Sequence, residues 1–202
     1  MGSVRDVAAE AAGIAAALGL TRASEVWEIG AGTGECALAL APRCRQVWAA
    51  DISPAMLAVA KRKAAERDIR NISFGDGGFL AGFAPPAPVH AIVSQLALHH
   101  LPDFWKFRAL QRLATFLLPG GRLFLRDVVF PGGLGDYDRH LAEFVGNLAA
   151  KGGEKMAVAT ARHIRDEYST FDWVLEGMLE RCGLRVIDRG GDGFLTFFLA
   201  GK

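Results

Sequence analysis

The sequence has few cysteines, almost no net charge and no long apolar run. Its three cysteines are widely spaced and form no Cys-x-x-Cys pair, which argues against a disulfide or zinc framework. The net charge of +1 offers no electrostatic footprint for nucleic acid or an anionic membrane. No apolar run could span a bilayer, and charged residues at 5, 6 and 10 make the start unlike a signal peptide. We therefore expect a cytoplasmic, metal-independent protein that binds neither nucleic acid nor membranes.

The length and composition predict a single domain over residues 1–202. A chain of this size with 51% apolar and 22% charged residues can bury a sizeable core. Residues 131–169 interrupt the alternation of strands and helices, with glycines around two helical patterns. We interpret this segment as a small helical insertion that forms a substrate lid over the carboxyl ends of the strands, where ligands bind in such folds. A helical decoration that only buries the edge of the core is the alternative.

Residues Glu28 to Gly34 read Glu-Ile-Gly-Ala-Gly-Thr-Gly and form the most informative stretch. They follow an apolar run at 25–29, typical of a buried strand, and precede a helical pattern that Pro42 ends. Glycines on such a turn permit a tight bend and let a ligand approach the backbone, next to the free N–H groups of the helix. Glu35 stands where a dinucleotide-binding fingerprint needs its third glycine, and no Lys-Ser/Thr pair of a phosphate loop follows. The spacing therefore disfavours a nicotinamide-dependent oxidoreductase.

Aspartates stand at the ends of the next two predicted strands. Asp51 follows the strand 46–50, and Asp76 follows the strand 71–74. A carboxylate at the end of the second strand can accept hydrogen bonds from both hydroxyls of a ribose. As alternatives, Asp51 could cap the following helix, although Ser53 already serves as a cap, and Asp76 could simply make an Asp-Gly turn.

The rest of the chain continues the alternation of strands and helices. A dense apolar strand leads into Gln95–Asp103, which contains two adjacent histidines, and Asp103 is expected to cap the next helix. Thr170 is expected to cap the last helix, and an antiparallel pair of strands ends the chain. The expected strands are 25–29, 46–50, 71–74, 89–94, 122–127, 184–188 and 194–200; the expected helices are 3–18, one from 35, one from 53–54, one from 103, 137–149, 158–168 and 171–181.

Over residues 22–130, the acidic-x-Gly-x-Gly-x-Gly turn, the strand-end aspartates and the Leu-x-Pro-Gly-Gly turn at 117–121 resemble class I S-adenosylmethionine (SAM)-dependent methyltransferases. The resemblance implies a doubly wound, mostly parallel seven-stranded sheet with a C-terminal antiparallel pair. It also implies SAM as cofactor and S-adenosylhomocysteine (SAH) as product. The implied cofactor-binding residues are Glu28 for the amino group; Gly30, Ala31, Gly32 and Gly34 for the methionine part; Asp51 for the ribose; Ile52, Asp76, Gly77 and Phe79 for the adenine; and Ser94 and Gln95 from the fourth strand.

Methyl transfer from a sulfonium is a direct displacement, which depends on positioning more than on covalent catalysis. We expect an oxygen, nitrogen or carbon atom of a small molecule as acceptor. His99 and His100 are the candidate catalytic residues, because they follow the fourth strand and histidine titrates near neutral pH; packing or capping roles are the alternative. Histidines of this sequence lack metal-ligand spacing, so no metal is predicted. Candidate substrate contacts in the insertion are Tyr137, His140, His163, Arg165, Glu167 and Tyr168, of which His163 and Tyr168 are preferred.

Other functions remain open from the sequence. A protein that binds SAM as a regulator or partner, without turnover, would need the same cofactor residues. A protein or RNA methyltransferase is disfavoured by the near-neutral charge, by the lack of an appended binding domain, and because no Asn/Asp-Pro-Pro-Tyr/Phe motif follows the fourth strand. A small-molecule acceptor is the expected partner, and the protein is expected to be a monomer or a homodimer.

Overall fold

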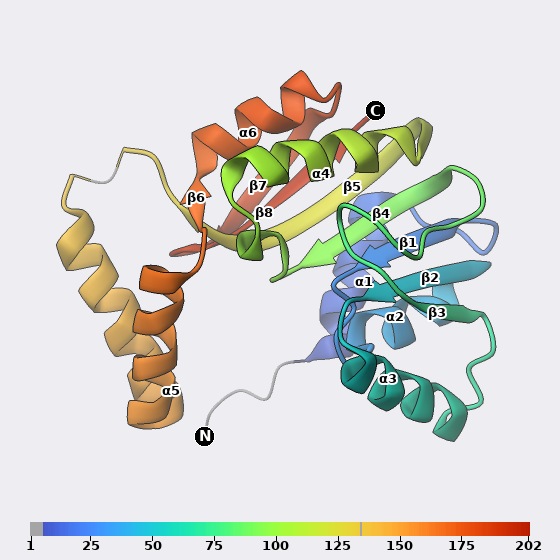
Figure 1. Ribbon diagram of the computed structural model, residues 1–202, viewed down its shortest axis with the longest axis horizontal. Coiled ribbons are helices and arrows are strands. Elements are labelled where there is room, and N and C mark those ends of the chain that lie inside the picture. Colours follow the sequence, from blue (N-terminus) through green and yellow to red (C-terminus); the bar gives the residue numbers. More distant parts are fainter. Residues whose placement is uncertain (1–5, 134) are drawn as a thin grey trace.

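A mixed sheet runs through the centre of the computed structural model, which describes residues 6–133 and 135–202 (Figure 1). Within these residues its main path has the order β3-β2-β1-β4-β5-β8-β7, and the short β6 pairs with the end of β5. The pairs along β3-β2-β1-β4-β5 are parallel, whereas β8 is antiparallel to both β5 and β7. The predicted doubly wound sheet with a terminal antiparallel pair is confirmed. The strands are β1 (Glu25–Ile29), β2 (Gln46–Asp51), β3 (Ile72–Asp76), β4 (Val89–Gln95), β5 (Leu117–Phe130), β6 (Thr170–Phe171), β7 (Arg185–Asp192) and β8 (Leu195–Gly201).

Helices cover both faces of this sheet. The first three α-helices lie together on one face, and α4 and α6 lie side by side on the other (Figure 1). Residues 3–5 of the first predicted helix lie outside the described residues. The helices are α1 (Val7–Leu18), α2 (Glu35–Leu40), η1 (Ala41–Arg43), α3 (Pro54–Glu66), η2 (Leu98–His100), α4 (Asp103–Thr115), α5 (Tyr137–Asp166) and α6 (Asp172–Arg181).

Alternation along β1 divides its side chains between two hydrophobic cores. Val26 packs in the core that contains α1 and α2, whereas Trp27 and Ile29 pack in the core that contains α4 and α6. All three side chains are fully buried, because a central parallel strand is covered on both faces. Close-packed cores on both faces fix the carboxyl ends of β1 and β4, where the candidate site lies.

Strand β5 is longer than the sequence predicts. It begins at Leu117 rather than Arg122 and runs through the expected Pro-Gly-Gly turn. The turn residues find partners of their own, since Leu117 pairs with Val89 and the chain end at Lys202 exchanges backbone hydrogen bonds with Gly120 and Gly121. Gly120 has a positive φ of 77°, so the chain bends at this glycine while the strand continues.

Two predicted helix caps are wrong. Asp103 is the first residue of α4, and its carboxylate accepts from the ammonium of Lys106 and the hydroxyl of Thr170. Thr170 lies in β6, and Phe171 occupies the cap position of α6. The Lys106 side chain is almost fully buried, and a buried ammonium needs a charged partner. Asp103 therefore pairs with Lys106 instead of capping α4, and the Thr170 hydroxyl donates to Asp103 instead of capping α6.

The two helices predicted within residues 131–169 join as α5, with one break at Gly153 (φ 74°, ψ −174°). Helix α5 lies apart from the sheet, on the side toward which β4 runs (Figure 1). Of the α5 side chains that the structure describes, only Thr160 is buried. No helix in the described parts of the chain is long and apolar enough to cross a membrane. The role of this segment as a lid stays a prediction.

Candidate active site

The three glycines of the turn after β1 serve different purposes. All have positive φ, at 73°, 53° and 79°, a conformation that glycine adopts without steric cost. A Cβ at Gly30 would lie 2.4 Å from the Cβ of Ala97, and one at Gly34 would lie 2.8 Å from the Cβ of Ala60. A Cβ at Gly32 would meet nothing within 4 Å. Gly30 and Gly34 therefore permit close packing, whereas Gly32 faces open space.

That open space belongs to a cavity of about 760 Å³ at the carboxyl ends of the parallel strands. Its walls include four apolar side chains that are unusually exposed for their size, Ile52, Met56, Leu80 and Leu96. An apolar cavity with a few polar groups is the usual form of a small-molecule site. The predicted site residues that line it are Gly30, Gly32, Asp51, Ile52, Asp76, Gly77, Phe79 and His100.

Asp51 connects the glycine turn to the end of β2. Its carboxylate accepts from the N–H of Gly32 at 2.7 Å and from the N–H of Ser53 at 2.8 Å. Asp51 thus makes a local turn contact at Ser53, but each carboxylate oxygen has a second lone pair for a ligand. Asp76 lies beside Asp51 in the β2–β3 register and is exposed at the cavity.

Other predicted cofactor residues lie behind the cavity wall. Glu28 is buried, and burial raises its pKa to about 8 against weaker opposing contacts with Cys36 and the Ala37 amide. Among the described residues, the Oε2 atom of Glu28, the Oγ of Ser94 and the Oε1 of Gln95 are buried without a hydrogen-bond partner. Buried polar atoms are rarely left unpaired, so three such atoms at the ends of β1 and β4 suit the polar group of a ligand.

Two of the predicted cofactor-binding residues pack inside the fold and do not face the cavity. Ala31 is buried, and its N–H donates to the carbonyl of Ala50 at 3.0 Å. Gly34 packs against Ala60. Neither residue lines the cavity.

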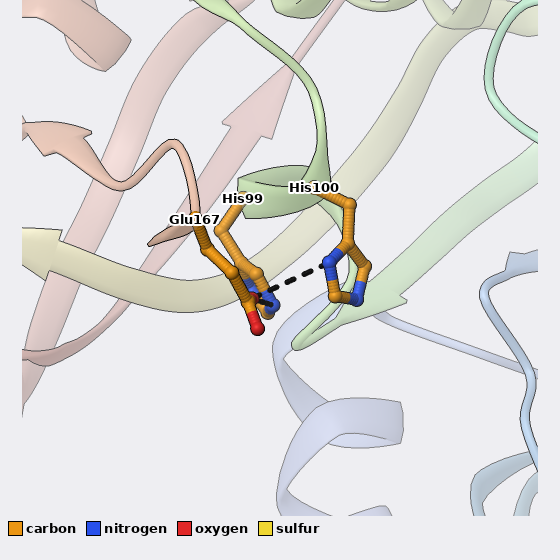
Figure 2. A group of neighbouring side chains, drawn as sticks. All are labelled: His99, His100 and Glu167. Atoms are coloured by element: carbon orange, nitrogen blue, oxygen red, sulfur yellow. Dashed lines mark ion pairs between the residues drawn. The ribbon is translucent and has the colours of Figure 1, made fainter. Parts of the chain in front are cut away.

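His99 and His100, in η2 after β4, meet Glu167 at the end of α5 (Figure 2). The Nε2 atom of His99 lies 2.9 Å from Glu167 Oε2, and the Nδ1 atom of His100 lies 3.3 Å from the same oxygen. On its other side the Nδ1 atom of the buried His99 ring contacts Oδ1 of Asp127, and Asp127 Oδ2 accepts from the backbone N–H of His99 at 3.0 Å. Two carboxylates thus fix the His99 ring, whereas the half-exposed His100 ring reaches the cavity.

His163 joins the same cluster from α5. Its Nδ1 atom lies 2.9 Å from Glu167 Oε2, and its Nε2 atom lies 3.3 Å from the hydroxyl of Ser169. Burial lowers the pKa of His163, and the neighbouring His99 adds to the effect. The structure therefore brings the two catalytic candidates, His99 and His100, together with the substrate candidate His163.

Residues 167–170, called the strap below, hold this cluster in place. The Tyr168 N–H donates to the carbonyl of His99 at 2.9 Å, and the ammonium of Lys106 donates to the carbonyl of Tyr168. Thr170 anchors the strap to Asp103 at 3.1 Å. Tyr168 makes these contacts through its backbone, whereas its side chain is 53% exposed.

From the sequence, Glu167 was a candidate substrate contact but not a preferred one, and Asp127 and Lys106 were not site candidates. Asp127 ends the strand predicted at 122–127, which neighbours the fourth strand that precedes His99, and this adjacency was a usable signal. Glu167 and Lys106 have local partners in His163 and Asp103, but the contacts that bring them to His99 and to the Tyr168 carbonyl join distant parts of the chain and leave no sequence signal. His140 lies elsewhere, near Glu143 in a second cavity of about 580 Å³ between α5 and the β7–β8 turn.

Leu96 has a positive φ of 53° where β4 ends. Left-handed backbone costs a residue with a Cβ about 1 kcal/mol or more, so Leu96→Gly is expected to be about 1 kcal/mol more stable than Leu96→Ala. Both variants lack the leucine side chain, so their difference isolates the backbone. Urea unfolding of the two variants measures it, and equal stabilities would show that the turn carries no strain.

The sheet order, the glycine turn and the cavity define the class I methyltransferase fold. A family model described as "Methyltransferase domain" matches residues 26–121. An uncharacterised methyltransferase of Geobacillus kaustophilus is 37% identical over 105 residues, which are 52% of this chain and 47% of that protein. One of Bacillus pumilus is 33% identical over 158 residues, or 78% of this chain and 68% of that protein. The chain belongs to the methyltransferase family of these relatives, although it spans only about half the length of the first.

Solved structures agree on the fold. The magnesium protoporphyrin IX methyltransferase of Synechocystis with bound SAH superposes with a TM-score of 0.68 and 19% identity, covering 97% of this chain and 81% of that one. At this identity the likeness concerns the fold alone.

Proposed function

We propose that this chain is a SAM-dependent methyltransferase that acts on an oxygen, nitrogen or carbon atom of a small molecule. The observation that carries the proposal is the cavity of about 760 Å³, which the glycine turn, both strand-end aspartates and His100 line together. A cofactor bound by the glycine turn and the two aspartates would present its reactive end to an acceptor beside His100. Bound SAM supplies an electrophilic methyl group.

The residues present suit the parts of this cofactor. The unpaired oxygens of Glu28 and Gln95 could accept from an ammonium group, and the open space at Gly32 leaves room for the methionine chain. Asp51 would accept from the ribose hydroxyls. Ile52 and Leu80, both exposed at the cavity, would cover the faces of the adenine.

The histidine cluster would bind the acceptor. His100 reaches the cavity, and His99 is held behind it by two carboxylates. Fixed groups of this kind raise the rate of a displacement by orienting the acceptor toward the methyl group. His163 on α5 and Tyr168 on the strap would contact the acceptor from the far side.

Calorimetric titration with SAM, SAH and NAD tests the cofactor assignment. We expect micromolar binding of both adenosyl ligands, about −8 kcal/mol, and no binding of NAD. A folded protein that binds neither SAM nor SAH would contradict the proposal. If the cofactor binds, incubation with isotope-labelled SAM and pooled metabolites should give a labelled product; cofactor binding without any product would instead favour a regulatory SAM-binding protein.

A further inference from the structure

We propose that His99, His100 and Glu167 form a binding site for a divalent first-row transition metal ion, with Zn²⁺ as the reference case, at the edge of the cofactor cavity. Each residue offers one ligand atom, and these atoms lie within 4.8 Å of one another (Figure 2). Sequence spacing predicted no metal, because the carboxylate comes from the far end of α5. The metal site does not depend on methyl transfer.

The distances fit a shared ion. Imidazole nitrogen and carboxylate oxygen bind Zn²⁺ at about 2.0–2.2 Å, so two ligands of a tetrahedral site lie roughly 3.4 Å apart. The two nitrogen–oxygen separations at Glu167 Oε2 are 2.9 Å and 3.3 Å. Small side-chain rotations would therefore accommodate an ion between the three residues.

Glu167 Oε2 is the central atom of the cluster. It is buried, and three imidazole nitrogens lie within 3.3 Å of it. Nevertheless, among the described residues none of them gives it a hydrogen bond of acceptable geometry. A buried carboxylate oxygen needs a hydrogen bond or a cation, and a metal ion bound with His99 and His100 would meet that need.

The groups around the ligands also match a metal site. Metal-binding histidines commonly donate their second ring N–H to a carboxylate, which fixes the ring and its tautomer. His99 contacts Asp127 in this manner, through Nδ1, and presents Nε2 to Glu167. His163 would support Glu167, since it lies between that carboxylate and the Ser169 hydroxyl.

The donor set indicates the class of metal. Two imidazoles and one carboxylate are typical of catalytic zinc and of other divalent transition metals, whereas Mg²⁺ and Ca²⁺ prefer oxygen ligands. Three protein ligands leave a position open, and His100 places this position at the cavity. If the proposed function holds, an acceptor with a hydroxyl, thiol or carboxylate group would bind there; this last step rests on that function.

The test uses the untagged full chain, stripped with a chelator and titrated with Co²⁺ by absorption and Zn²⁺ by calorimetry. We expect one ion per chain. His100→Ala and Glu167→Gln should each lower the affinity at least tenfold, and Asp127→Asn should lower it by about 10- to 100-fold. The His100 side chain is 61% exposed, so His100→Ala should fold normally. Its loss of metal affinity can therefore be measured even if the variants at buried positions do not fold.

His140→Ala and Glu143→Gln are the matched controls, because they change the same residue types in a pair 3.6 Å apart on α5, outside the cluster. They should leave the affinity unchanged. Substoichiometric binding by the wild type, or equal losses in control and cluster variants, would overturn the site. A SAM titration of each sample separates the two proposals: SAM binding without metal binding refutes only the metal site, and the reverse refutes only the proposed function.

Discussion

Glu28→Gln is expected to stabilise the cofactor-free protein at pH 8 by on the order of 4 kcal/mol. The pKa of Glu28 rises from 4.5 to about 8 in the folded chain, because the carboxyl is buried. Between these values the unfolded state has lost a proton that the folded state keeps. The free energy of unfolding therefore carries no penalty from Glu28 below pH 4.5, and it falls by up to about 1.4 kcal/mol per pH unit between pH 4.5 and pH 8. Glutamine has nearly the same shape and stays neutral, so it removes this cost.

Urea unfolding between pH 5 and pH 9 measures this effect. Glu66→Gln, at the exposed end of α3, is the matched control and should follow the wild-type curve. The difference between Glu28→Gln and the wild type should grow with pH and level off above pH 8. A constant difference across the range would mean that Glu28 ionises normally in the folded protein.

Asp51→Ala is expected to lower SAM affinity by about 10- to 100-fold, because hydrogen bonds to a charged group contribute about 1.5–3 kcal/mol. The ribose assignment alone predicts little change in folding. The structure predicts in addition that Asp51→Ala lowers the free energy of unfolding by about 1–2 kcal/mol, since the N–H groups of Gly32 and Ser53 lose their acceptor.

Asp51→Asn is the informative companion, because it keeps one oxygen acceptor and removes the charge. Its loss of stability and its loss of affinity should both be smaller than those of Asp51→Ala. Calorimetry with SAM and urea unfolding of both variants give the two quantities separately. Unchanged SAM affinity in a folded Asp51→Ala would remove Asp51 from the cofactor site.

The elements near the glycine turn were predictable because their signals are local. The run 25–29 and the glycines that follow specify a strand and a tight turn. Asp51 could be chosen as a site residue because it stands at the end of the next predicted strand. Together with the family resemblance, these signals implied a doubly wound, mostly parallel sheet with a terminal antiparallel pair, which the structure confirms. The apolar run also predicted a buried strand, and Val26 and Trp27 are fully buried.

The acceptor side was harder to predict because its contacts are long-range. Nothing in the sequence pairs His99 with Glu167, and only the adjacency of two predicted strands indicates Asp127, since β5 and α5 meet η2 only after folding. The caps failed for a related reason. Local propensity favours Asp103 and Thr170 as caps, but the Asp103 carboxylate accepts from the buried Lys106 of its own helix and, across the fold, from the Thr170 hydroxyl.

The strap has a consequence for how this site could change over evolution. Tyr168 is held through its own N–H and carbonyl, whereas its ring is largely exposed. Position 168 can therefore exchange its side chain while His99 and Lys106 keep the same backbone partners. Changes there would alter the surface offered to an acceptor but leave Glu167 in place. If the proposed function holds, the fold separates the choice of acceptor from the positions of His99 and Glu167, so single substitutions at position 168 could change the acceptor and leave the histidine cluster in place.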